Sequence, residues 1–149
     1  MTPSTHLRQR QSGAYLLEAL IGILIFSFGI LGIVGLQAQA IRFTNDSEYR
    51  AEAVYLANAL ISKMWTDDRT QLQAKYASPS GPEYINFKNQ VQNEIPGSTA
   101  SPPVVLVDDA SLPTAPSKTS SVVQVQIFWS LPGDSTKHNY VTTGVVGQN

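Results

Sequence analysis

The first pattern along the chain is a long apolar run near its beginning. Residues 19–36 form 18 consecutive positions without a charge, and 12 of them are leucine, isoleucine, phenylalanine or valine. At about 0.3–0.6 kcal/mol each, these side chains together favour insertion into a bilayer by about 5 kcal/mol. A helix over residues 14–36 is about 34 Å long, enough to cross the apolar core of a membrane. The pattern therefore predicts a transmembrane segment.

The same helix is expected to continue beyond the membrane as an amphipathic segment over residues 37–66. No proline occurs between Ala14 and Trp65, so the whole helix is about 78 Å long at about 1.5 Å per residue. Its second half carries an apolar stripe made of Ala53, Val54, Leu56, Ala57, Leu60, Ile61, Met64 and Trp65. Such a stripe packs on a core, and we assign Met64 and Trp65 to that core rather than to a ligand pocket. The helical pattern ends at Asp67 and Asp68.

Residues 67–149 carry the pattern of a globular α+β head. After a loop at residues 78–82, apolar side chains recur at helical spacing from Glu83 to about Glu94. These side chains are Tyr84, Phe87, Val91 and Ile95. Pro96 and Gly97 follow and stop this second, amphipathic helix.

Three strands are expected in the rest of the head. Residues 104–107 form a short candidate edge strand within a stretch rich in proline and serine. Apolar side chains then alternate with glutamine and phenylalanine from Val123 to Trp129, and a turn at 131–135 leads to a partner strand at 140–146. A lone hairpin is marginal in water, so the apolar stripe of the long helix is its expected cover. The predicted fold class is α+β, a long N-terminal helix packed on a small antiparallel sheet.

Composition and charge exclude several kinds of function. The chain has 149 residues, a formal net charge of −1 and no cysteine. No basic patch is present for nucleic acid, and disulfides and thiol chemistry are excluded. There are two histidines; His6 lies in the basic leader, and we assign His138 to a solvated position in a polar turn. No Ser-His-Asp arrangement, phosphate-binding loop or zinc spacing occurs, so we expect no enzyme activity, catalytic residue or cofactor.

Metal binding is likewise not expected, with one question left open. Three aspartates lie in loops: Asp108, Asp109 and Asp134. If these loops come together, the carboxylates could form the clustered oxygen ligands that calcium prefers. Solvated carboxylates in turns are the commoner case.

The N-terminal residues allow three interpretations. A plain anchor accounts for the apolar run but not for Glu18 inside it. A secretory signal is supported by residues 38–40, Ala-Gln-Ala, which would leave Ile41 as the first residue after the cut. In the third interpretation Gly13 ends a leader, and the new amine of Ala14 lies one helical turn from the Glu18 carboxylate. Arg8 and Arg10 precede the span, which places the N-terminus in the cytoplasm and exports the rest.

The third interpretation matches a known family. Gly13, Ala14 and Glu18 resemble the class III signal of type IV pilins and pseudopilins, although Tyr15 is a mild departure from it. "FGILGIVGLQAQAI" from residue 28, "RAEAVYLANALISKMW" from residue 50, "IPG" and "VQVQIFW" resemble the PilV family of minor pilins, the type IV pilus modification proteins. The resemblance is firm over the first 65 residues or so and thin afterwards. Minor pseudopilins of type II secretion share much of this pattern.

The resemblance implies both processing and function. A prepilin peptidase would cut between Gly13 and Ala14 and methylate the Ala14 amine. Residues 1–13 would then be the leader, and residues 14–36 and 37–66 would be the transmembrane and amphipathic halves of the helix. Residues 67–149 would form a periplasmic head. Glu18 would act as an assembly charge. The protein would be a single-pass inner-membrane subunit that enters the pilus with the major pilin and other minor pilins and helps to initiate assembly, cell adhesion and twitching motility. The alternatives are a type II secretion pseudopilin and a binding module that uses the loop at 96–121.

Three glycines recur inside the apolar run, at Gly29, Gly32 and Gly35. Glycine costs a helix about 0.5–1 kcal/mol relative to alanine. Either these small residues let another helix approach closely, or they form a segment that can stretch or unwind. In assembled pili of the resembled family, this part of the helix loses helicity.

Overall fold

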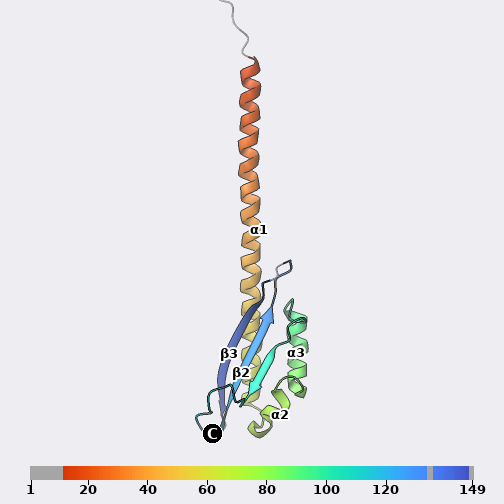
Figure 1. The fold of residues 1–149 in the computed structure, drawn as a ribbon, viewed down its shortest axis with the longest axis vertical. Coiled ribbons are helices and arrows are strands. Elements are labelled where there is room, and N and C mark those ends of the chain that lie inside the picture. Colours follow the sequence, from red (N-terminus) through yellow and green to blue (C-terminus); the bar gives the residue numbers. More distant parts are fainter. Residues whose placement is uncertain (1–11, 134–135, 148–149) are drawn as a thin grey trace, which may run out of the picture. The chain divides into compact units, whose positions relative to one another are not determined.

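The computed structural model describes residues 12–133 and 136–147. Most of the expected leader, with Arg8, Arg10 and His6, lies outside these residues, as does Asp134. The chain divides into two compact units, one up to Ile41 and the other from Arg42 onward. Each unit is described by itself, and Figure 1 shows the elements along the chain.

The first unit is the beginning of a long helix. Helix α1 runs over Ser12–Trp65 and confirms the expected continuous helix. Every side chain from Gly13 to Ile41 is exposed. An apolar helix without any buried side chain in this stretch has no core of its own to pack against.

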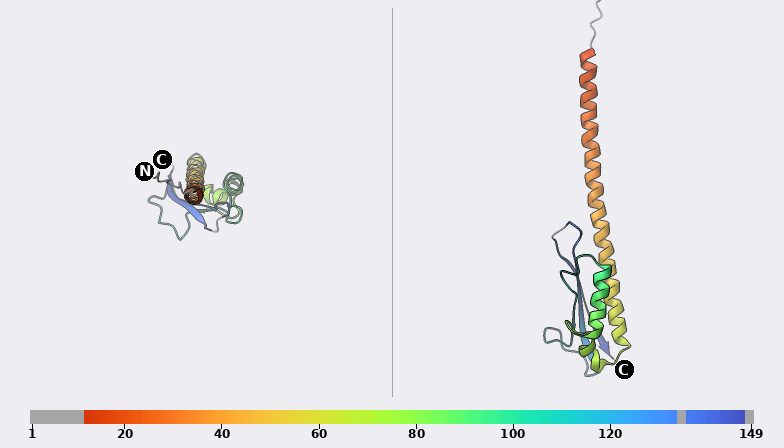
Figure 2. Two further views of the ribbon diagram at one scale, coloured as in Figure 1. Left: turned by 90° about the horizontal axis from the view of Figure 1, so that it is seen from above. Right: turned by 90° about the vertical axis from the view of Figure 1, so that its right-hand side faces the viewer.

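The second unit has two layers, a sheet and the helices that cover one of its faces. The three strands are β1 (Val104–Val107), β2 (Ser120–Trp129) and β3 (His138–Gly147). They form one antiparallel sheet in the order β1-β2-β3. In Figure 2, α3 and the α1 residues from Arg42 onward lie on one side of this sheet, and no described helix lies on the other. The predicted α+β fold class is therefore confirmed.

The stripe on α1 packs on the sheet as expected, with one exception. The buried α1 side chains are Ala53, Leu56, Ala57, Leu60 and Met64, and Val54 and Ile61 are half-buried. Trp65, however, is 50% exposed, so its assignment to the core is wrong. Adjacent helical residues point about 100° apart, and Met64 takes the inward position one turn after Leu60. Trp65 is therefore turned outward.

Helix α3 covers Pro82–Glu94 and confirms the second predicted helix. Tyr84, Phe87, Val91 and Ile95 are all buried, so the helical spacing identified the correct face. Gly97 follows with φ +76, and a Cβ there would lie 2.1 Å from Ser130 Oγ. Only glycine fits this left-handed, crowded position.

The hairpin is longer than the sequence suggested. Strands β2 and β3 pair over ten residues, from Ser120↔Gly147 to Trp129↔His138. The expected burial of Val123, Val125, Ile127 and Trp129 is confirmed. Asp108 helps to start β2 early, because its Oδ1 accepts a hydrogen bond from the Val122 amide at 2.8 Å.

Two short helical segments between α1 and α3 were not expected. They are η1 (Arg69–Gln71) and α2 (Leu72–Tyr76). Asp68 caps η1 by accepting the Thr70 amide hydrogen bond. Leu72 and Tyr76 are fully buried, one turn apart, and hold α2 against the core.

Candidate functional site

The candidate processing motif lies in the first turns of α1. Gly13 is the second helical residue, and a Cβ added there would meet no atom within 4 Å. Ala14 and Glu18 are both exposed. They are four positions apart, so they lie on one helix face about 6 Å apart along the axis. An amine created at Ala14 would therefore start the same exposed face that carries the carboxylate.

The apolar part of α1 is compatible with a membrane anchor. Among the described residues, one helix, Gly13–Trp65, is long and apolar enough to cross a membrane. None of its most apolar window is buried. Core helices of water-soluble proteins pass the same test of length and composition but are mostly buried, whereas this segment presents its apolar side chains to its surroundings.

No contact inside the described chain requires the three regularly spaced glycines. A Cβ at Gly29, Gly32 or Gly35 would meet open space. Both explanations for them, close approach of another helix and local softness, therefore concern what the helix does with other molecules or under load. Ser27 precedes them and donates its hydroxyl to the Ile23 carbonyl at 2.7 Å, a bond of the kind that favours slight bending.

Within the second unit, a polar cluster joins the β2–β3 hairpin to the α1 residues that follow Ile41. The buried Trp129 indole donates through Nε1 to Asp46 Oδ1 at 3.0 Å. His138 Nδ1 lies 3.2 Å from the same oxygen, and its ring stacks on Trp129 with centroids 5.8 Å apart. The assignment of His138 to a solvated turn is therefore wrong: it is the first residue of β3, and its side chain is only 28% exposed. Nothing in the sequence indicated Asp46, because its partners Trp129 and His138 are 83 and 92 residues away along the chain.

Replacing Asp46 tests how much this cluster stabilises the head. In Asp46→Ala the buried indole N–H of Trp129 loses its acceptor, which costs about 1–3 kcal/mol. We expect a lower midpoint of thermal unfolding and a weaker near-ultraviolet circular dichroism signal from Trp129. Glu48→Ala removes a carboxylate from an exposed position of the same helix and serves as the control. Equal unfolding midpoints for the two variants would contradict a structural role of Asp46.

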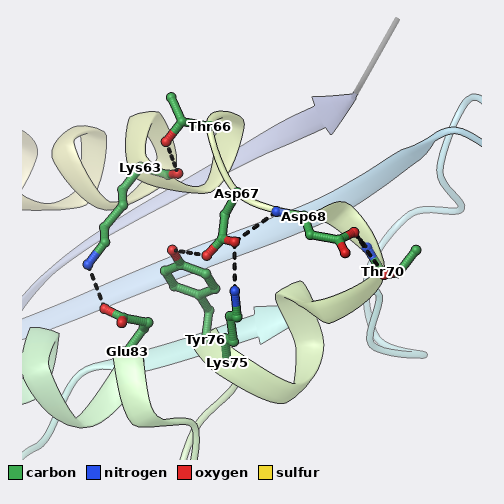
Figure 3. Close-up of polar contacts among 8 residues, drawn as sticks. All are labelled: Lys63, Thr66, Asp67, Asp68, Thr70, Lys75, Tyr76 and Glu83. Atoms are coloured by element: carbon green, nitrogen blue, oxygen red, sulfur yellow. Dashed lines mark hydrogen bonds and ion pairs between the residues drawn. The ribbon is translucent and has the colours of Figure 1, made fainter.

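A second polar cluster joins the end of α1 to α2 and α3 (Figure 3). Asp67 Oδ1 accepts hydrogen bonds from Lys75 Nζ at 2.7 Å and from the Asp68 amide at 2.8 Å, and Oδ2 accepts the Tyr76 hydroxyl at 2.9 Å. These bonds, that of Lys75 foremost, lower the pKa of Asp67 to about 2. Lys63 pairs with Glu83 at 2.5 Å and ties α1 to α3. The contacts of this cluster therefore tie the end of α1 to both α2 and α3.

Two of the candidate calcium ligands, Asp108 and Asp109, accept hydrogen bonds from the protein itself. Asp108 binds the Val122 amide, and Asp109 accepts hydrogen bonds from the amide and hydroxyl of Ser111 at 2.9 and 2.6 Å. These bonds from Ser111 lower the pKa of Asp109. Within residues 12–133 and 136–147, no three histidine, cysteine, aspartate or glutamate side chains gather as metal ligands. The third candidate, Asp134, is not among those residues.

Gly13, Ala14 and Glu18, the expected processing and assembly residues, thus lie at the start of an exposed apolar helix. The head is an α+β domain in which two polar clusters, around Asp46 and Asp67, join its elements. No model of a protein family, no curated protein and no solved structure matches this chain.

Proposed function

We propose that the chain is a minor pilin of a type IV pilus, related to the PilV family. One observation carries this proposal: Gly13-Ala14 is followed four residues later by Glu18, at the tip of an exposed apolar helix that continues into an α+β head. A plain anchor has no use for the carboxylate, and a secretory signal would not need the helix to continue past its cut.

The chemistry of the segment suggests how such a subunit works. Cleavage after Gly13 and methylation of Ala14 leave a cationic amine one helical turn from Glu18. In the membrane both charges sit near the headgroups, where they cost little. Inside a bundle of helices a charge needs a partner. The Ala14 amine of a neighbouring subunit pairs with Glu18 and so sets the axial register, as buried polar groups do in coiled helices.

The proposed role is assembly rather than catalysis. The subunit is held in the inner membrane by residues 14–36, with its head in the periplasm, until it joins other minor pilins to initiate the filament. It then enters the pilus with the major pilin. Its partners are therefore the membrane, the prepilin peptidase and the other pilin subunits, and it contributes to adhesion and twitching motility through the filament.

The first residue of the mature protein tests this proposal. We expect Ala14, with or without a methyl group, and a mature chain of 136 residues after the loss of 13 from 149. Losing Arg8 and Arg10 changes the formal net charge from −1 to −3. Intact mass and N-terminal sequencing of the membrane-extracted protein measure this. A chain that begins at Ile41 would identify a secretory signal instead, and an uncut chain would identify a plain anchor.

Processing at Ala14 is shared with pseudopilins, so a deletion strain separates the two systems. Fewer surface pili, with an unchanged pool of major pilin in the membrane, support the pilus assignment. Unchanged piliation and motility together with loss of a secreted enzyme would place the subunit in type II secretion.

A further inference from the structure

The two edge strands of the sheet in the head, β1 and β3, differ in whether their outward backbone groups have hydrogen-bond partners. At the β1 edge, Ser78 donates its amide to the Val105 carbonyl at 2.9 Å, and the Val105 amide donates to Ser78 Oγ at 3.3 Å. The Tyr84 hydroxyl donates to the Pro103 carbonyl at 2.9 Å just before this strand. The outward backbone groups of Val105 are therefore satisfied, and α2 lies beside β1 in Figure 1. This edge is closed to a further strand.

The register shows which groups point outward at the β3 edge. The Asp108 amide donates to the Val122 carbonyl, so the backbone of Val122 is directed toward β1. Backbone direction alternates along a strand, so the odd-numbered residues of β2 bond β3. Their partners in β3 are even-numbered. The amides and carbonyls of Val141, Thr143 and Val145 therefore point away from the sheet.

These outward groups are unpaired within the described part of the chain. No backbone or side-chain hydrogen bond reaches the outward amides or carbonyls of Val141, Thr143 and Val145 from residues 12–133 or 136–147. Val141 and Val145 are 43% and 42% exposed. No aspartate, glutamate, lysine or arginine and no proline occurs in His138–Gly147. Proteins usually block a free edge with charges, proline or a bulge, and β3 has none of these.

The direction of the strand decides what can occupy this edge, an argument that rests on the proposed function. Two identical β3 edges match residue for residue only as antiparallel strands about a two-fold axis, which sets the two heads in opposite directions. Subunits drawn from one membrane into one filament run in the same direction. The β1 edge of a second copy is closed by Ser78. A second copy of this chain therefore does not fit.

We propose that the free edge of β3 is the docking site for an edge strand of a different pilin subunit. The added strand receives the amide hydrogens of Val141, Thr143 and Val145 and donates its own to their carbonyls, which extends the sheet from three to four strands. Because the neighbouring side chains on β3 are aliphatic or hydroxylic, the strand that fits best carries no charge at the facing positions.

Two variants of Thr143 test the site in the full chain. Thr143→Pro removes one outward amide and leaves the backbone hydrogen bonds to β2 intact, since proline is tolerated at an edge with its nitrogen turned outward. Thr143→Lys adds the charge that natural edges use against pairing. The control is Gln124→Lys, because Gln124 Nε2 donates to Thr143 Oγ1 at 3.2 Å. The control loses the same side-chain bond and gains the same charge, but on the central strand.

The measurement uses the full chain co-expressed, one at a time, with each of the other pilin subunits of the same host, and extracted in detergent. We expect one subunit to co-purify with the wild type and with Gln124→Lys. Its yield should fall at least tenfold with both Thr143 variants, whose thermal unfolding midpoints verify that the head is folded. The amides of Val141, Thr143 and Val145 should exchange hydrogen more slowly in the complex than in the chain alone.

Wild-type yields with both Thr143 variants, or unchanged exchange of these amides in the complex, would refute the docking site. A further outcome is that the chain alone forms dimers and the Thr143→Pro variant does not. That result would refute the proposal that a different subunit occupies the edge. A mature terminus other than Ala14 would remove the proposed function itself, so failure of the docking site and failure of the function are separate results.

Discussion

We expect a Gly13→Val variant to lose the proposed mature form that begins at Ala14, so that the full chain of 149 residues accumulates in the membrane. The peptidase must bring the backbone at the cut close to its own catalytic groups, and a branched side chain obstructs that approach. The chain itself tolerates the change, since a Cβ at Gly13 meets no atom within 4 Å. Loss of cleavage would therefore report on the peptidase. The measurement is an immunoblot with intact mass, and incorporation into sheared filaments should be lost with it.

The matched control is Gly22→Val. Gly22 also lies in the apolar part of α1, and a Cβ there meets equally open space. Both variants place a β-branched residue in the same helix, but Gly22 is nine positions beyond Gly13. The control should be processed as the wild type is. Normal cleavage of Gly13→Val, or loss of cleavage in both variants, would contradict the assignment of Gly13 to the processing site.

The second large effect is expected for Glu18→Gln at the stage of assembly. If Glu18 only marks the start of the helix, glutamine serves as well, because both residues are good helix formers. If it pairs with an Ala14 amine of a neighbour, glutamine leaves that amine without a counter-ion. Breaking one side of a buried pair costs about 3–5 kcal/mol, which disfavours entry into the filament by roughly 100-fold or more. Insertion and cleavage should be retained, since both occur while Glu18 sits near the headgroups.

The measurement for Glu18→Gln is recovery in sheared pili and co-purification with other minor pilins, after a mature Ala14 terminus has been verified. Glu48→Gln is the control, because it makes the same change of charge at an exposed position of the same helix. Recovery equal to the wild type for Glu18→Gln would show that the carboxylate is no docking charge. Equal losses for both variants would indicate a general effect of charge.

Regular periodicity made most of the fold predictable. Helix α1, the buried face of α3 and the phase of β2 follow from spacings that each repeat over at least three turns or pairs. Segment α2 was missed because Leu72 and Tyr76 form a single repeat in a helix of five residues. Trp65 was misassigned because apolar character alone does not decide between adjacent positions at the edge of a stripe.

The candidate sites differ in the same way. Gly13, Ala14 and Glu18 are local in sequence, so their spacing could be recognised directly. The bonds around Asp46 join α1 to the end of the hairpin, and the free edge of β3 is defined by which strand pairs with which. Contacts between residues far apart in the chain leave no periodic trace, so neither feature was predictable from one sequence.

The division of the chain after Ile41 makes the folding of the head independent of the apolar half of α1. Every residue of the hydrophobic core, including the partly buried Tyr49, lies in the unit that begins at Arg42. If the chain is a pilin as proposed, no core side chain would change its surroundings when the first unit exchanges lipid for protein neighbours. The head could then complete its folding before assembly, and entry into a filament would rearrange only the apolar half of α1. A shortened chain that starts at Arg42 keeps Asp46 and every core residue, so we expect it to fold as a water-soluble domain.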